Sequence, residues 1–144
     1  MTNNEILYKV NERSMVCIFG EIFLIIAFIL ISCIAFSSDK ILFTSFGVFL
    51  ALFALYIFIV LITFNELVIY KDRVEINRKF FGISIIKIDE IKYVLVHGSL
   101  FSEWLSFQLK SSRFSYLKYL VTSLHIKDEC EIRNIIKNLQ GDKQ

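Results

Sequence analysis

The chain has 144 residues, of which 56% are hydrophobic and 21% are charged, with a formal net charge of +2 at pH 7 and no proline. Soluble domains contain about 45–50% apolar residues and about 5% proline, so this composition is typical of a membrane protein and excludes an average soluble domain. Domains usually have about 100–200 residues, so the length also excludes a multidomain enzyme.

Two long apolar stretches hold most of the hydrophobic residues. Residues 15–36 contain one charged side chain and residues 41–64 contain none. A helix of about 20 apolar residues crosses a hydrocarbon core of about 30 Å, so both stretches are long enough. Because the connector, residues 37–40, is short, we expect an antiparallel transmembrane hairpin over residues 15–64, preceded by a separate N-terminal segment, residues 1–14.

The basic residues predict the orientation of this hairpin. Lys9 and Arg13 precede it, the connector carries Lys40, and the other 13 of the 16 basic residues follow it. Short segments rich in Lys and Arg stay on the cytoplasmic side. We therefore expect a multi-pass protein of the bacterial inner membrane with both termini in the cytoplasm.

Glu21 is an acidic residue inside the first apolar stretch. A carboxylate within a membrane is a functional candidate by default, because its burial there is costly. It lies only about 10 Å from the start of the helix, at 1.5 Å per residue, so it can also reach the interface. Two interpretations stay open: a structural or interfacial group, or a group that lines an oligomer interior or a permeation path.

Small residues in the second stretch form a candidate face for helix packing. Gly47 and Ala51 are four residues apart, and Ala54 follows on the same face. Such a face lets helix backbones approach closely within lipid. It could serve the hairpin itself or self-association of the protein, and the sequence leaves both open.

Residues 66–144 predict a small α+β cytoplasmic domain. Apolar residues there alternate with period two, which predicts an antiparallel β-sheet or partial barrel of about six strands. The expected strands cover residues 67–70, 74–77, 83–88, 91–96, 104–110 and 116–124. Helical spacing of apolar residues, with Asp128 and Glu131 as a capping box and Gly141 as a stop, predicts a capping helix over residues 128–139.

The order of these elements resembles a known family. The stretch LVIYKDRVEINRKFFGISIIKIDEIKYVLV combines a hairpin, an aromatic-glycine turn, a strand that ends in an acidic step, and a further strand. It is similar to the start of bacterial pleckstrin-homology-like (PH-like) domains, many of which follow two transmembrane helices. The resemblance covers residues 66–139 and implies a PH-like fold, for which seven strands are expected.

The sequence contains no recognisable catalytic or metal-binding motif. His97 and His125 are far apart, the five glycines are isolated, and the cysteines have no ligand spacing: Cys17, Cys33 and Cys130. We therefore expect neither an enzyme nor a cofactor or metal site.

Four basic residues form the remaining candidate site, a possible anion site on the first cytoplasmic hairpin: Lys71, Arg73, Arg78 and Lys79. They could contact anionic lipid headgroups, hold a phosphate-bearing ligand between arginine forks, or form a solvated basic face. The domain after residue 65 has 13 basic and 10 acidic residues, a net charge of +3, which is too small for non-specific binding of nucleic acid.

Three functional hypotheses follow. The first is a non-enzymatic inner-membrane protein whose cytoplasmic PH-like module mediates self-association and binds a partner or an anionic ligand. The second is an antiviral-defence effector, similar in layout only, whose cytoplasmic domain binds a cyclic oligoadenylate and whose helices perturb the membrane. The third is an immunity protein against a toxin. The expected partners are the lipid bilayer, further copies in a homo-oligomer, and an anionic lipid or cyclic nucleotide.

Overall fold

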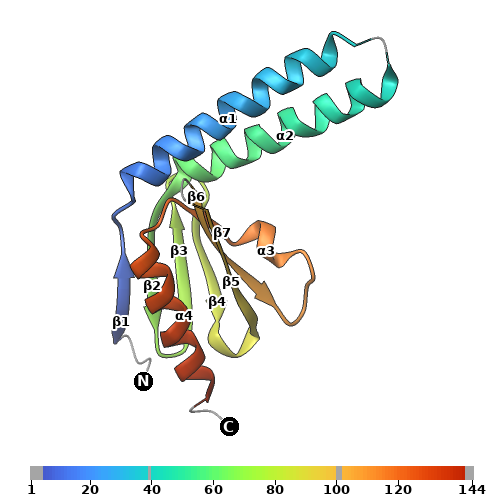
Figure 1. Cartoon of the computed structure of the whole chain (residues 1–144). Helices are drawn as coiled ribbons and strands as arrows, with labels where there is room; N and C mark the ends of the chain where they lie inside the picture. Colours follow the sequence, from blue (N-terminus) through green and yellow to red (C-terminus); the bar gives the residue numbers. More distant parts are fainter. Residues whose placement is uncertain (1–4, 39, 100–101, 142–144) are drawn as a thin grey trace.

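A computed structural model describes residues 5–38, 40–99 and 102–141. Two long antiparallel helices project from a β domain that contains the first and the last described elements of the chain (Figure 1). These helices, α1 (Met15–Phe36) and α2 (Ile41–Thr63), are long and apolar enough to cross a membrane. Their bounds agree with the expected stretches to within one residue.

The two helices pack through small side chains. Ala54 is buried in their interface, among Ile25, Ile57 and Leu61. A Cβ atom placed on Gly47 would lie 3.0 Å from the Cβ of Ala35, so glycine permits the close approach there.

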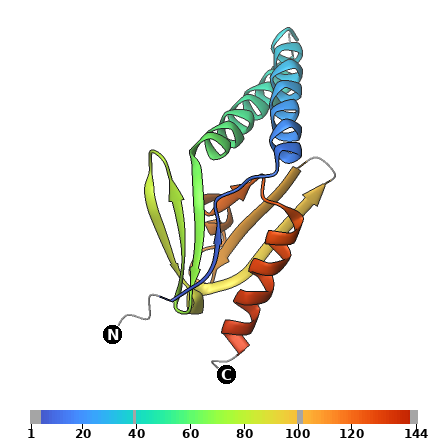
Figure 2. The same cartoon turned by 90° about the vertical axis from the view of Figure 1, so that its left-hand side faces the viewer.

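The β domain consists of two antiparallel sheets and a C-terminal helix. The first sheet has the order β1 (Ile6–Val10), β2 (Phe64–Tyr70), β3 (Arg73–Arg78), β4 (Gly82–Lys87), and the second has the order β5 (Ile91–Ser99), β6 (Ser102–Leu109), β7 (Leu120–Thr122). A single 3-10 turn, η1 (Ile88–Glu90), links the two sheets, and the short helix α3 (Ser115–Lys118) precedes β7. Figure 2 shows the two sheets diverging as separate layers below the helices, with helix α4 (Ile126–Gly141) alongside.

The core of the domain lies between the sheets and α4. Period-two alternation turns one face of each strand inward, and α4 adds its apolar stripe. The side chains that form the core are fully or almost fully buried: Leu67, Ile69, Val74, Ile76, Ile86, Leu105, Phe107, Val121, Ile132 and Ile136. The Gln140 amide also donates to the backbone oxygens of Ile91 (2.7 Å) and Ile88 (3.2 Å), which fixes α4 against η1 and β5.

The structure adds one strand to those expected. The six strands expected after residue 66 correspond to β2–β7, and the described residues add a seventh, β1, from the N-terminal segment, which pairs with β2 from Val10↔Leu67 to Ile6↔Tyr70. The antiparallel sheet structure is confirmed, but the described strands form two separate sheets, connected along the chain by η1, and no closed barrel.

Two boundaries in the C-terminal part also differ from the expected ones. The strand expected over residues 116–124 is α3 followed by the three-residue β7, because Ser115 Oγ accepts a hydrogen bond from the Leu109 amide (2.7 Å) and holds the chain in a turn. The helix expected over residues 128–139 begins at Ile126, so Asp128 lies in its first turn and is no N-terminal cap.

Candidate functional site

Arg13 joins the beginning of α1 to the end of α2. Its guanidinium donates to the backbone oxygens of Leu61 and Phe64 and lies 5.0 Å from the centroid of the Phe64 ring. The last carbonyl groups of a helix have no partner within the helix and carry partial negative charge, so a cation there is favourable. Burial lowers the pKa of Arg13, and the nearby Glu21 carboxylate acts in the opposite direction.

Glu21 is fully buried at the contact between α1 and β7. Its carboxylate lies beside Thr122 and Ser123, yet the side-chain oxygens of all three lack a hydrogen bond of good geometry within the described part of the chain. The Ser14 amide donates to the Ser123 oxygen (2.8 Å), which holds the start of α1 on the same segment. Within one chain, Glu21 therefore faces the β domain and not the outer surface of the hairpin.

A second set of contacts holds the β domain along α2. The Trp104 ring of β6 lies 6.3 Å from the ring of Phe53, and the Tyr56 hydroxyl donates to the Leu117 oxygen. Arg78 of β3 donates to the oxygen of Leu120 (2.7 Å), the first residue of β7, and burial lowers the pKa of Arg78. The domain thus contacts α2 over its last eleven residues, from Phe53 to Thr63.

An open cleft of about 580 Å³ lies where the two helices meet the domain. We call it the junction cleft. Its lining is apolar on the helices and polar at their bases: Ile18, Ile22, Phe58, Leu61, Ile62 and Phe64, with Asn11, Arg13, Asn65 and Lys79. None of these described lining residues is acidic.

Lys79 stands at the rim of the junction cleft. Its amide donates to the oxygen of Thr63 (2.7 Å), which places the β3–β4 turn beside the end of α2. The side chain is exposed and makes no ion pair with the residues that the structure describes.

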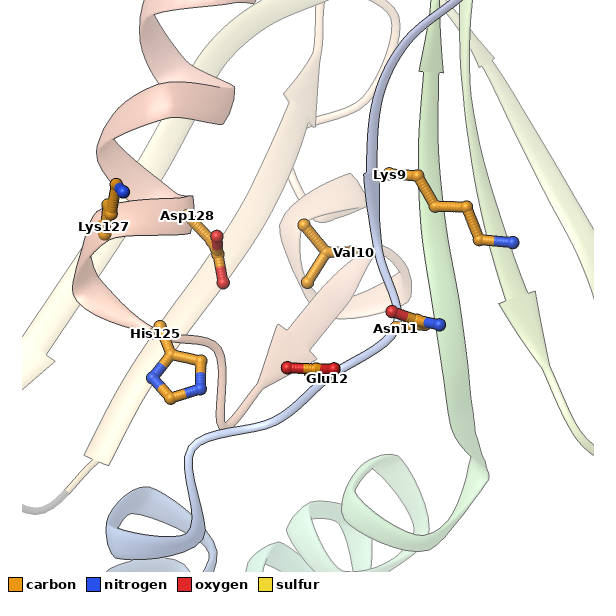
Figure 3. A pocket seen from close by; sticks show the side chains of 7 residues that line it. All are labelled: Lys9, Val10, Asn11, Glu12, His125, Lys127 and Asp128. Carbon is orange, nitrogen blue, oxygen red and sulfur yellow. The ribbon is translucent and has the colours of Figure 1, made fainter.

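A separate polar groove of about 370 Å³ lies between the loop after β1 and the start of α4 (Figure 3). Its lining residues are Lys9, Val10, Asn11, Glu12, His125, Lys127 and Asp128. The Tyr8 hydroxyl donates to Asp128 (2.7 Å) and ties β1 to α4, and burial together with this bond raises the pKa of Tyr8. A search of the described residues finds no cluster of three His, Cys, Asp or Glu side chains that could hold a metal.

The four basic residues of the predicted anion site lie at two opposite ends of β3. Lys71 forms an ion pair with Glu5 at the far end. Arg73 lies at the same end, where its hydrogen bond to Glu75 (2.7 Å) raises its pKa and its guanidinium lies 4.3 Å from the Tyr70 ring centroid. Arg78 and Lys79 lie at the end next to the helices, so the structure does not bring the four together.

The predicted helix-packing residues lie mainly inside the hairpin. Gly47 and Ala54 contact α1, whereas Ala51 lines an apolar groove of about 380 Å³ along both helices. Their use in self-association stays a prediction.

Sequence reasoning overlooked the role of Arg13 and the polar side chains near it. Its place two residues before a long apolar stretch indicates only the orientation of the hairpin. The signal that could have revealed a site is the pair of asparagines that also flanks the hairpin, Asn11 before α1 and Asn65 after α2. Comparison of the chain with family models, curated proteins and solved structures finds no match.

Proposed function

We propose that the protein is a non-enzymatic, membrane-anchored binding module, in which the α1–α2 hairpin lies in the bilayer and holds the β domain at the cytoplasmic surface. The observation that carries this proposal is the exposure of the hairpin. In the 18 most apolar consecutive residues of each helix, only 22% are buried within the structure in α1 and 39% in α2. Phe23 (71% exposed) and Leu42 (76% exposed) illustrate a surface too apolar for water, which lipid would cover.

The contacts along α2 support a location of the β domain within the interfacial layer. The 12 residues from Ile41 to Leu52 are free of the contacts with Trp104 and Leu117 and span about 18 Å. This is shorter than a hydrocarbon core of about 30 Å. The surface around Trp104 and Tyr56 would therefore enter the bilayer from its boundary, the region where Trp and Tyr side chains are favoured.

The β3–β4 turn supports the same location. Phe80 (78% exposed) and Phe81 (67% exposed) project from this turn, which Lys79 holds beside the end of α2. Exposed aromatic rings next to basic side chains suit the boundary between headgroups and acyl chains.

Binding, and not catalysis, is the role that the domain supports best. Its polar concavities are the groove between β1 and α4 and the junction cleft, and both open to the surface. The C-terminal helix packed on antiparallel sheets supports the PH-like interpretation, and self-association belongs to the same proposal.

The native cysteines offer a test of anchoring and orientation. Cys33 is exposed near the far end of α1, and Cys130 is exposed on α4. Each is retained as a single cysteine, the others are changed to Ser, and a membrane-impermeant maleimide is applied to spheroplasts and to inverted vesicles. We expect the protein to stay in carbonate-washed membranes, and Cys130 to react only in inverted vesicles.

The same samples contain the control. Cys33, surrounded by lipid, should react only after detergent is added. Release of the protein by carbonate would overturn the anchoring, and labelling of Cys130 from outside the spheroplast would overturn the orientation.

A further inference from the structure

The junction cleft combines an apolar wall with a basic base. Ile22 on α1 and Phe58 and Ile62 on α2 are each at least 40% exposed and form the wall toward the middle of the hairpin. Arg13 and Lys79 lie at the helix ends, where the domain begins. A molecule that fits this arrangement has an apolar chain and an anionic head in the same order.

We propose that the junction cleft binds a phospholipid with an anionic headgroup, with the phosphate between Arg13 and Lys79 and an acyl chain along Ile22, Phe58 and Ile62. This inference rests on the proposed membrane anchoring. The volume of about 580 Å³ is within the range of ligand pockets. It accommodates the headgroup and the first part of a chain, and the rest of the lipid stays in the bilayer.

The donors needed for a phosphate are present. Arg13 uses two of its terminal nitrogens for the oxygens of Leu61 and Phe64. A guanidinium has five N–H groups, so further donors remain for an anion. Lys79 adds an ammonium group that has no ion-pair partner among the described residues.

The nearby carboxylates do not oppose an anion in the cleft. Glu21 is buried against β7 and partly balances Arg13. Glu66 is held by Lys9 (2.7 Å) and Asn77 (3.3 Å) on the first sheet. No acid is present among the described residues that line the cleft, so its charge complements a phosphate.

The apolar wall favours a lipid over a soluble phosphate compound. A free anion would gain nothing from Ile22, Phe58 and Ile62, whereas an acyl chain would cover them. The cleft also lies beside Thr63, the last residue of α2, which is the level expected for headgroups in the proposed arrangement.

Native mass spectrometry of the full-length protein tests the proposal. The protein in detergent is mixed with equal amounts of phosphatidylglycerol and phosphatidylcholine of identical chains, and the bound lipid is counted. We expect wild type to retain one phosphatidylglycerol in preference to phosphatidylcholine. Lys79→Gln should weaken this preference about fivefold, as expected for one basic group at a membrane surface.

Lys87→Gln is the matched control. Lys87 is exposed at the opposite end of the β3–β4 hairpin, where it pairs in register with Arg73, and its substitution removes the same charge. We expect it to keep the wild-type preference. Equal retention of the two lipids by wild type, or equal losses in Lys79→Gln and Lys87→Gln, would overturn the proposal.

Two further measurements separate the alternatives. Millimolar glycerol phosphate, which has the anion without chains, should not displace the lipid; displacement would show a site for a free phosphate and overturn the lipid assignment. A failure of membrane anchoring would appear as release by carbonate, whereas a failure of this proposal alone would leave anchored protein without lipid preference.

Discussion

Arg13 donates a hydrogen bond to the backbone oxygen of Leu61, a residue 48 positions later in the chain. The side chain that precedes α1 thereby closes the end of α2, which would otherwise leave carbonyl groups without partners. One guanidinium therefore fixes the two ends of the hairpin that adjoin the β domain relative to each other.

Removal of the Arg13 charge should destabilise the fold. Arg13→Gln loses the bonds to Leu61 and Phe64 and leaves buried carbonyl groups, at a cost of about 2 kcal/mol. Thermal unfolding of the protein in detergent should show a lower midpoint than wild type. Arg113→Gln, at an exposed position in the loop before α3, should melt as wild type does. Equal unfolding midpoints for Arg13→Gln and wild type would show that the hydrogen bonds of Arg13 contribute nothing to stability.

A larger side chain at position 47 should disrupt the hairpin. In Gly47→Val, a Cβ atom would lie 3.0 Å from Ala35 Cβ and 3.2 Å from the Ser32 oxygen, so the helices must separate. Overpacking of this kind costs about 1–3 kcal/mol. We expect a lower melting midpoint with an unchanged molar mass in detergent.

Ser45→Val, at an exposed position on the same helix, is the control for this change and should melt as wild type does. A smaller oligomer for Gly47→Val, without loss of stability, would instead assign the small-residue face to contacts between copies.

Trp104 should report on the depth of the β domain. It is the only tryptophan and contacts Phe53 in α2. In liposomes, its fluorescence should be quenched by lipids brominated near the headgroup and protected from acrylamide. The control moves the tryptophan to position 108 on the same strand, in Trp104→Phe combined with Gln108→Trp, about 13 Å further along. Stronger quenching at position 108 than at position 104 would contradict the proposed location.

The attachment of β1 should depend on pH. Hydrogen bonds from Lys9 and Asn77 lower the pKa of Glu66 below its ordinary value. Because the folded state favours the ionised form, this stabilisation is present above the ordinary glutamate value of about 4.3 and is lost as the pH falls through the lower, folded value. The protection factors of the β1 amides in hydrogen exchange, which correct for the intrinsic pH dependence of the exchange rate, should fall in acid.

Glu66→Gln should remove most of this acid dependence, since glutamine does not titrate. Glu90→Gln, whose exposed side chain lies 4.0 Å from Lys87, should retain it. If the β1 amides lose protection in acid equally in wild type and in Glu66→Gln, the pH dependence would belong to another group.

Local sequence patterns predict the α1–α2 helical hairpin and most of the strands. The two helices follow from uninterrupted apolar stretches, and the β2–β3 hairpin follows from alternation around a short turn that contains Asp72. By contrast, β1 pairs with a strand beyond both helices, and nothing within residues 6–10 indicates that partner. The turn at Ser115 depends on a bond to Leu109, which alternation alone does not reveal.

The candidate site was less predictable than the fold. The four basic residues are close in sequence, but a strand rises about 3.3 Å per residue, so Arg73 and Arg78 lie about 16 Å apart along β3. The junction cleft instead combines Arg13 and Lys79, which belong to segments on either side of the hairpin. Proximity in sequence therefore groups cations that the fold separates, and only the tertiary arrangement places Arg13 and Lys79 at one cleft.

The pairing of β1 with β2 has a consequence for the order of synthesis. The residues of β1 leave the ribosome before α1, but their partner strand begins at Phe64, after α2. β1 can complete the first sheet only when both helices have been made and have brought β1 and β2 together. The β domain is therefore complete only after the helical hairpin has formed. A fragment that begins after α2 would lack β1 and leave the edge of β2 open to pairing with other chains.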